Sequence, residues 1–125
     1  MAVKYTYFIN IKLLVLLLVM PDLQSSREML RLKRKLSVEL LWIYLLSILK
    51  EKPLHAYALR KSVSEQFGFL PGNVSAYVVL YNLESRGFVS TRKDENRVVY
   101  TITEKGRSLL LAAEKELRGM IGKLF

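Results

Sequence analysis

The segment that most constrains the fold of this chain is NVSAYVVLYNLESRG, residues 73–87, together with the stretch that follows it. Its apolar residues recur at helical spacing and predict one face packed on a core: Ala76, Val79, Leu80 and Leu83. Gly87 tolerates the left-handed backbone with which a chain often leaves a helix. The following FVSTRKDENRVVYTIT has the alternation of a hairpin, with its turn at 94–96. This order predicts a winged helix-turn-helix, and the open alternative is the helix–hairpin corner of another small α+β domain.

The opposite face of this helix is aromatic, small and uncharged. It carries Val74, Tyr77, Tyr81 and Ser85, and the only charges of the segment are Glu84 and Arg86. Asn73 is the residue type that caps helix N-termini, so we expect it to be the N-cap. A helix that shows water such a face is a candidate for contact with a partner.

The size and charge of the chain indicate one basic domain with extensions. Its 125 residues have room for a single core. Lys and Arg number 20 against 11 Asp and Glu, which gives a net charge of +9. Such an excess predicts attraction to polyanions, either nucleic acid or an anionic membrane surface.

Residues that carry catalysis are scarce. The chain has no Cys and a single histidine, His55, and it lacks both G-x-x-x-x-G-K and G-x-G-x-x-G. A nucleophile needs a positioned base, and a phosphate-binding loop needs its glycines and lysine. We therefore expect no enzyme, no cofactor and no metal site, and we expect His55 to be a helix cap or a packed side chain rather than a pH switch or a ligand.

The N-terminal extension, residues 1–23, is apolar, with an unbroken apolar run at 13–20 that is too short to span a bilayer. Two interpretations stay open. Either the extension is an ordered element that covers apolar surface in an oligomer, or it follows an upstream start codon and the functional chain begins near Met20 or Met29. A membrane partner is not expected, and the predicted location is the cytoplasm.

A basic arm follows at 24–35. Either Ser25 or Ser26 is suited to cap a short helix there. The cations of the arm are Arg27, Arg31, Lys33, Arg34 and Lys35. The arm is either a solvated linker or a contributor to salt-dependent binding of phosphates.

Two further helices are expected before residue 73. SVELLWIYLLSIL at 37–49, with Ser37 as its N-cap, is too apolar for one stripe and must be buried on more than one side. LHAYALRKSVSEQFG at 54–68 has an apolar stripe of Leu59, Val63 and Phe67. A turn at 69–72 then leads to the 73–86 helix, which completes a three-helix unit.

Three stretches of the chain resemble the PadR family of transcriptional regulators: LLSILKEKPLHAYALRKSVSEQFG, NVSAYVVLYNLESRGFVS and NRVVYTITEKGRSLL. The family pattern runs P-x-H-G-Y-E-L, then L-Y-x-x-L-x-x-L-E-x-x-G, then R-x-x-Y-x-L-T-x-x-G. The resemblance covers about residues 36–111, and these positions match it: Pro53, His55, Tyr57, Leu59, Tyr77, Leu80, Leu83, Glu84, Gly87, Arg97, Tyr100, Thr103 and Gly106. Ala56, Ala58 and Val78 depart from the family's Gly, Glu and Pro.

The resemblance implies a winged helix that binds double-stranded DNA. The predicted contacts on or beside the recognition helix are Asn73, Ser75, Tyr77, Tyr81, Asn82 and Arg86, with Tyr57, Arg60 and Lys61 on the preceding helix and Arg92, Lys93 and Arg97 on the wing. Side chains near the start of the recognition helix read base edges in the major groove, while cations and hydroxyls bind phosphates. The helix has no Lys or Arg before Arg86, so we expect modest sequence preference that leans to A·T.

The last helix is expected to begin after Thr103 as its N-cap. Its apolar stripe consists of Leu109, Leu110, Ala113, Leu117 and Ile121, which a small winged helix does not cover by itself. The resemblance makes the partner a second copy, giving a homodimer. It also allows a small hydrophobic or aromatic effector between subunits, for which Trp42 and Tyr44 are candidate lining residues or else simply core.

The fold class predicted is mainly α with a small β-hairpin wing. The predicted divisions are an extension at 1–23, a basic arm at 24–35, a winged-helix domain at 36–103 and a dimerisation helix at 104–125. The predicted function is a dimeric, sequence-specific DNA-binding transcriptional regulator that acts as a repressor. The alternative is a membrane-peripheral adaptor that is anchored by residues 1–20 and binds protein through its winged helix.

Overall fold

The computed structural model of the chain describes residues 11–18 and 23–125. It divides into two units, Met1–Leu36 and Ser37–Phe125. The remainder of the predicted extension, 1–10 and 19–22, lies outside the described residues. Among those that are described, no helix combines the length and the apolar character needed to cross a bilayer.

The first unit contains helical residues 11–18, all of them exposed, and helix α2, Arg27–Arg34. Ser26 is the N-cap of α2, and its hydroxyl accepts a hydrogen bond of 3.2 Å from the Met29 N–H. One of the two predicted caps is thereby confirmed. The cations Arg31, Lys33 and Arg34 lie in the last turn, where the helix dipole favours positive charge.

The predicted start of a helix at Ser37 is wrong. Residues Lys35–Glu39 form a π-helix, η1, and helix α3 spans Leu41–Leu49 with Leu40 as its N-cap. The sequence between Arg27 and Leu49 has neither Gly nor Pro, so nothing in it stops helical backbone at residue 36. Ser37 is a good capping residue at a position where no helix begins.

The second unit has α3 at its centre. As expected, this helix is buried on more than one side, and Leu45, Leu46 and Leu49 are at most 1% exposed. It contacts helix α4, Ala56–Phe67, helix α5, Asn73–Ser85, and the last helix. Leu59 and Val63 of α4 are fully buried as predicted, whereas Phe67 is 41% exposed because it lies in the last turn, where its ring packs at the edge of the core against Tyr44.

The β-structure is a three-stranded antiparallel sheet in the order β1-β3-β2. The predicted hairpin consists of β2, Val89–Asp94, and β3, Arg97–Ile102, joined at Glu95 and Asn96. Strand β1, Leu54–His55, pairs with Tyr100 and Val99 and was not predicted, because two residues carry no periodicity. His55 does occupy the N-cap position of α4, but among the described residues its side chain makes no capping hydrogen bond.

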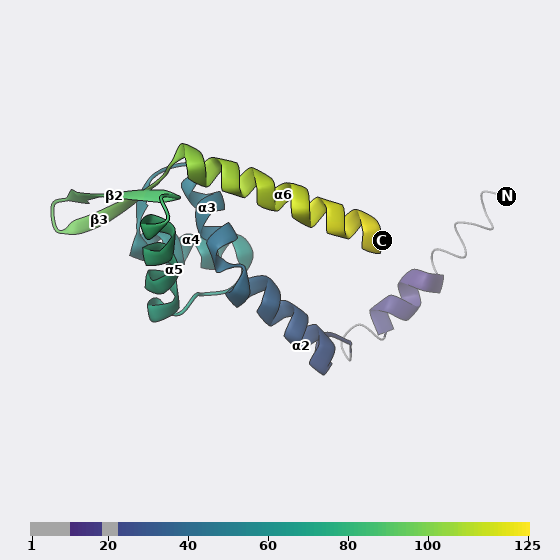
Figure 1. Ribbon diagram of the computed structural model, residues 1–125. Helices are drawn as coiled ribbons and strands as arrows, with labels where there is room; N and C mark the ends of the chain where they lie inside the picture. Colours follow the sequence, from purple (N-terminus) through teal and green to yellow (C-terminus); the bar gives the residue numbers. More distant parts are fainter. Residues whose placement is uncertain (1–10, 19–22) are drawn as a thin grey trace. The chain divides into compact units, whose positions relative to one another are not determined.

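Helix α6, Glu104–Leu124, leaves the end of β3 and passes α3 (Figure 1). Thr103 is its N-cap as predicted, and the Thr103 hydroxyl accepts a hydrogen bond of 3.0 Å from the Gly106 N–H. The fold class is therefore the predicted one, mainly α with a small antiparallel sheet, and it has the element order of a winged helix.

Candidate nucleic-acid interface

Helix α5 is fixed by one apolar face. Ala76 and Leu80 are fully buried and Leu83 is 5% exposed, as the spacing predicted. The other face is open to solvent: Val74 is 76% exposed and Tyr81 69%, and Asn73, Ser75, Tyr77 and Asn82 are exposed as well. All six contact residues predicted on or beside this helix are therefore accessible, but Asn82 and Arg86 lie at the rim of a hollow lined by Trp42, Phe88 and Leu109.

The start of α5 differs by one residue from the prediction. Gly72 is the N-cap and Asn73 is the first helical residue, because the Gly72 carbonyl already accepts the helical hydrogen bond from the Ala76 N–H at 2.9 Å. The preceding turn is held by Arg60, whose Nε donates to the Pro71 carbonyl at 3.0 Å. Arg60 therefore has a structural role in placing the N-terminus of α5, where backbone N–H groups are available to an anion.

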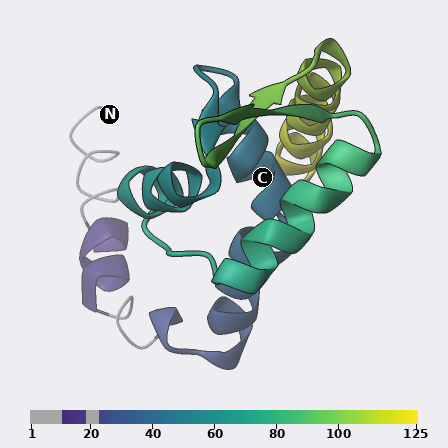
Figure 2. The same ribbon diagram turned by 90° about the vertical axis from the view of Figure 1, so that its left-hand side faces the viewer.

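The wing carries three exposed cations. Arg92, Lys93 and Arg97 are all exposed, and Figure 2 shows the hairpin and α5 on the same side of the second unit. Arg92 Nη1 lies 3.9 Å from Asp94 Oδ2, and Arg97 Nη1 lies 3.4 Å from His55 Nε2. Exposed pairs at these distances are weak, so the cations remain able to exchange them for phosphates.

A polar contact links the wing to the recognition helix. The Thr91 hydroxyl donates to Glu84 Oε1 at 3.1 Å. Close to it, burial raises the pKa of the Tyr100 phenol, and the charge of Glu84 and the phenol of Tyr77 raise it further. Tyr100 belongs to β3, so helix, wing and sheet meet at these side chains.

The remaining predicted contacts lie on α4. Tyr57 and Lys61 are exposed and line a shallow hollow with Arg60 and Leu70. Lys61 Nζ lies 3.9 Å from Glu65, one helical turn on. These residues surround the turn before α5, and their contact with DNA stays a prediction.

Lys105 was not among the sequence-predicted site residues. It lies in the first turn of α6, and its Nζ donates to the Arg86 carbonyl at 2.7 Å. The sequence signal that could have located it is its position two residues after the N-cap Thr103, directly beyond the wing strand. Lys105 brings a cation to the C-terminal end of α5.

The two aromatic residues considered for an effector have different surroundings. Trp42 lines a cavity of about 490 Å³ with Leu83, Phe88 and Leu109. Tyr44 instead packs against Phe67 and Phe69, with ring centroids 4.9 and 5.0 Å apart. Of the pair, only Trp42 is placed to meet a small molecule in this cavity.

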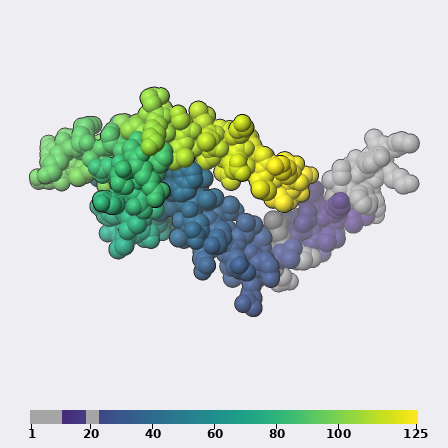
Figure 3. Space-filling model, viewed as in Figure 1, coloured from purple at the N-terminus to yellow at the C-terminus, as the bar shows by residue number. Residues whose placement is uncertain are grey.

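The predicted stripe of α6 is incompletely covered by its own chain. Leu109, Leu110 and Ala113 are half-buried, whereas Leu117 is 39% and Ile121 56% exposed. A groove of about 600 Å³ runs between α3 and α6 and is lined by Ile43, Leu110, Leu117 and Ile121 among others. Figure 3 shows the length of α6 at the surface of the second unit.

The sequence profile of the Transcriptional regulator PadR-like family matches residues 45–112, which include α4, α5, the wing and the first turns of α6. This chain belongs to the PadR-like family. The resemblance seen in its motifs is thereby confirmed. Membership makes the protein a transcriptional regulator of a DNA-binding family and not an enzyme.

Solved structures agree with this assignment. A putative transcriptional regulator from Thermoplasma acidophilum is 31% identical, and the alignment covers 72% of this chain and 94% of that one with a TM-score of 0.60. A PadR family regulator from Eggerthella lenta is 26% identical, with 75% and 82% covered and a TM-score of 0.65. One from Clostridium difficile is 26% identical, with 68% and 93% covered and a TM-score of 0.61. Comparison with curated proteins gives no match.

Proposed function

We propose that this PadR-like protein is a dimeric, sequence-specific DNA-binding repressor. In this proposal α5 lies in the major groove and the wing, residues 92–97, contacts the backbone or the minor groove. The observation that carries the proposal is the pairing of an exposed, uncharged face on α5 with an exposed cationic hairpin on the same side of the unit.

The composition of α5 defines what it can recognise. Asn73, Tyr77 and Asn82 offer hydrogen bonds, and the exposed Val74 and Val78 are suited to contact thymine methyl groups. The helix has no Arg or Lys within Asn73–Ser85, so it lacks the usual bidentate guanine reader. We infer a preference for A·T pairs whose strength depends on apolar and amide contacts.

The cations supply the part of the affinity that is independent of sequence. Arg92, Lys93 and Arg97 on the wing attract the phosphates, and the basic arm at 24–35 and the net charge of +9 of the whole chain add to this attraction. Each phosphate that they neutralise releases condensed counterions, which lowers the log–log slope of affinity against salt by about 0.9. A regulator of this design binds DNA broadly and then selects sites with α5.

Dimerisation follows from the stripe on α6. Leu117 and Ile121 stay substantially exposed in the single chain, and the adjoining groove between α3 and α6 has apolar side chains bordered by charged ones such as Lys50 and Arg118. A second copy of α6 has the matching surface, and a two-fold pair is the simplest closed assembly. Two recognition helices then read the two halves of an inverted repeat.

The test begins with selection of bound fragments from a random DNA library, followed by footprinting of the selected site. Affinity for that site and for random duplex is then measured across a salt series. Replacing Arg92, Lys93 and Arg97 together by Ala is expected to weaken binding to both DNAs alike and to reduce the salt slope. Tyr77→Ala or Asn73→Ala is expected to weaken the selected site more than random DNA.

Two outcomes contradict the proposal. Affinity that does not change with salt rules out the phosphate contacts. The second is the opposite ranking, in which the wing variant loses more affinity for the selected site than for random DNA and the α5 variants lose the same on both. This result means that the hairpin and not α5 reads the sequence.

A further inference from the structure

The start of α6 is attached to three consecutive backbone carbonyls of the segment that follows α5, residues 86–88. Lys105 Nζ donates to the Arg86 carbonyl at 2.7 Å, and the Thr103 hydroxyl donates to the Gly87 carbonyl at 2.7 Å. The Thr103 N–H donates to the Phe88 carbonyl at 3.1 Å. These carbonyls belong to the C-cap residue Arg86 and to the two residues that lead into β2, so the start of α6 holds the segment that joins α5 to the wing.

The contact is also sterically closed. Gly87 leaves α5 with φ of 82°, which favours glycine, and it presents its carbonyl to Thr103. Gly106 is buried, and a Cβ at this position would overlap the Phe88 carbonyl oxygen. The start of α6 therefore meets the segment after α5 backbone to backbone, which limits the range of angles between the two helices.

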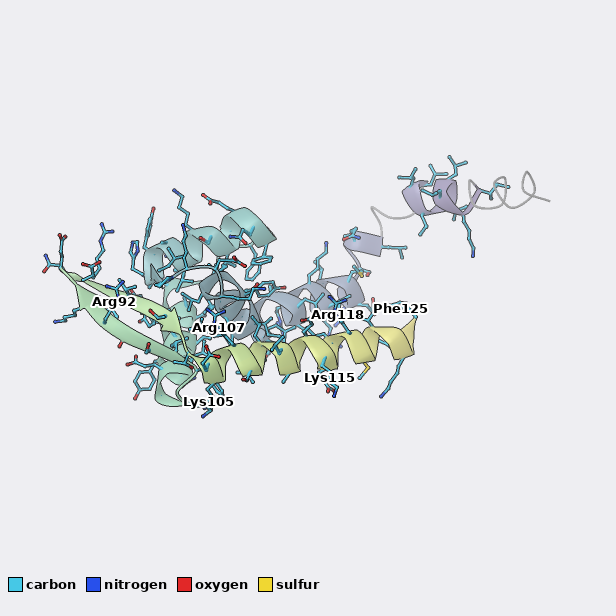
Figure 4. The ribbon with its side chains drawn as sticks, turned by 90° about the horizontal axis from the view of Figure 1, so that it is seen from above. Arg92, Lys105, Arg107, Lys115, Arg118 and Phe125 are labelled. Atoms are coloured by element: carbon cyan, nitrogen blue, oxygen red, sulfur yellow. The ribbon has the colours of Figure 1, made fainter. Side chains whose placement is uncertain are left out.

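Lys105 contributes a side-chain hydrogen bond to this contact, which a substitution can remove without changing the backbone. Its ammonium lies 4.8 Å from the centroid of the Phe88 ring while it donates to the Arg86 carbonyl. A cation is favoured at the C-terminal end of a helix by the helix dipole. Figure 4 shows Lys105 at the start of α6, where the helix leaves the hairpin.

We propose that Lys105 and Thr103 are positioning residues that fix the direction of α5 relative to α6, and that they thereby set the half-site spacing that the dimer accepts. This inference rests on the proposed function, because spacing has a meaning only for two recognition helices joined through α6. Neither residue needs to touch DNA for this role. Thr103 also caps α6, so Lys105 is the residue whose replacement isolates the effect.

The competing role for Lys105 is a simple phosphate contact. A phosphate contact contributes equally on every sequence and every spacing, and its loss reduces the salt slope by about one. Loss of a positioning residue changes neither the affinity for random DNA nor the salt slope. The two roles therefore differ in what they do to random DNA.

The test uses the full-length protein, its selected inverted repeat and a series of the same half-sites with altered spacers. Lys105→Met keeps the alkyl chain and removes the hydrogen bond, and Lys105→Arg is the matched control that keeps a donor. Lys105→Met is expected to keep the affinity for random DNA and the salt slope. Its discrimination between spacings is expected to fall about three- to tenfold, the effect of losing one solvent-exposed hydrogen bond. Lys105→Arg is expected to retain most of the wild-type discrimination between spacings.

Two results with this series overturn the inference. One is unchanged discrimination in Lys105→Met. The other is an equal loss on every DNA together with a shallower salt slope, which makes Lys105 a phosphate contact.

A second measurement separates failure of the inference from failure of the proposed function. The chain has no Cys, so Val74→Cys and Lys115→Cys place spin labels only on α5 and α6. The distance within one chain is measured after dilution with unlabelled protein. If the distance distribution broadens in Lys105→Met, Lys105 fixes the direction of α5 relative to α6. If the wild type also shows no preferred half-site spacing, only the proposal that a dimer reads DNA is contradicted. Equal widths overturn the inference.

Discussion

Thr91, in the first strand of the wing, donates a hydrogen bond of 3.1 Å to the carboxylate of Glu84, in the last turn of α5. Both side chains are exposed, so water competes for each partner and the bond adds little to the free energy of unfolding. Its effect is on orientation, since it joins the two elements that are proposed to touch DNA.

We predict that Thr91→Val, which keeps the shape of the side chain, lowers affinity for the selected site about threefold while stability changes by less than about 1 kcal/mol. The wing would still carry its cations but would be held less firmly beside α5. Anisotropy titration and urea unfolding measure the two quantities. Ser90→Ala, one residue earlier and on the other face of the strand, is the control; equal effects in both variants would remove the orienting role from Thr91.

A second prediction concerns alkaline pH. The pKa of Tyr100 is raised above its usual 10.0, first by burial and then by Glu84 and Tyr77. The folded state therefore holds this proton more tightly than the unfolded state does. Its contribution to stability is complete below about pH 10 and is lost as pH rises through the raised pKa.

Tyr100→Phe is therefore expected to show a shallower loss of stability above about pH 10 than the wild type, when urea midpoints are compared across pH. Glu84→Gln removes one of the causes and should lower the pKa of Tyr100, measured as tyrosinate absorbance by difference from Tyr100→Phe. The same alkaline loss in wild type and Tyr100→Phe contradicts the assignment.

The sequence predicted the parts of the fold that repeat. Ala76, Leu80 and Leu83 lie on one stripe, so spacing alone identified the buried face of α5. Thr103 and Gly87 have local conformational roles that their residue types reveal. The β-hairpin was predictable because alternation on both sides of a polar turn is itself a local signal.

Other features depend on residues that are distant in the sequence. Strand β1 is defined by its pairing with β3, some 45 residues later, and not by its own two residues. The bond from Arg60 to the Pro71 carbonyl and the bond from Lys105 to the Arg86 carbonyl exist only once the helices are packed. At Ser37 a favourable cap residue was present, but the helical backbone around it decided the outcome. Local propensity was overridden there by the surrounding helix.

A third prediction concerns the core under α5. Leu80 is fully buried and belongs to the main cluster of buried side chains. Leu80→Ala removes apolar contact and leaves a cavity, so it is expected to cost about 2–5 kcal/mol, a large share of the roughly 5–15 kcal/mol that stabilises a small domain. Val78→Ala, on the exposed face of the same helix, is the matched control and should change stability by less than about 0.5 kcal/mol. Thermal and urea unfolding measure the stability of both variants. A Leu80→Ala variant as stable as the wild type would show that the buried face of α5 has been assigned wrongly.

The last prediction concerns assembly. Leu117 lies in the exposed stripe of α6 and lines the groove against α3. In a dimer built on this stripe, Leu117→Glu buries a carboxylate in an apolar seam, which is costly without a partner charge. The variant is expected to be a monomer by light scattering while its circular dichroism stays that of a folded winged helix.

Ala112→Glu is the control, because it adds the same charge to an exposed position of the same helix outside the stripe. It should remain a dimer.

In the wild-type dimer the two recognition helices are expected about one turn of B-DNA apart, roughly 34 Å, so scrambling one half-site should remove most of the specific affinity. For Leu117→Glu, which presents a single recognition helix, the intact and the half-scrambled site should bind alike. A wild-type mass of one chain, or an undisturbed dimer in Leu117→Glu, would reject α6 as the dimer contact, whereas equal wild-type affinity for both DNAs would show that a single chain reads the site.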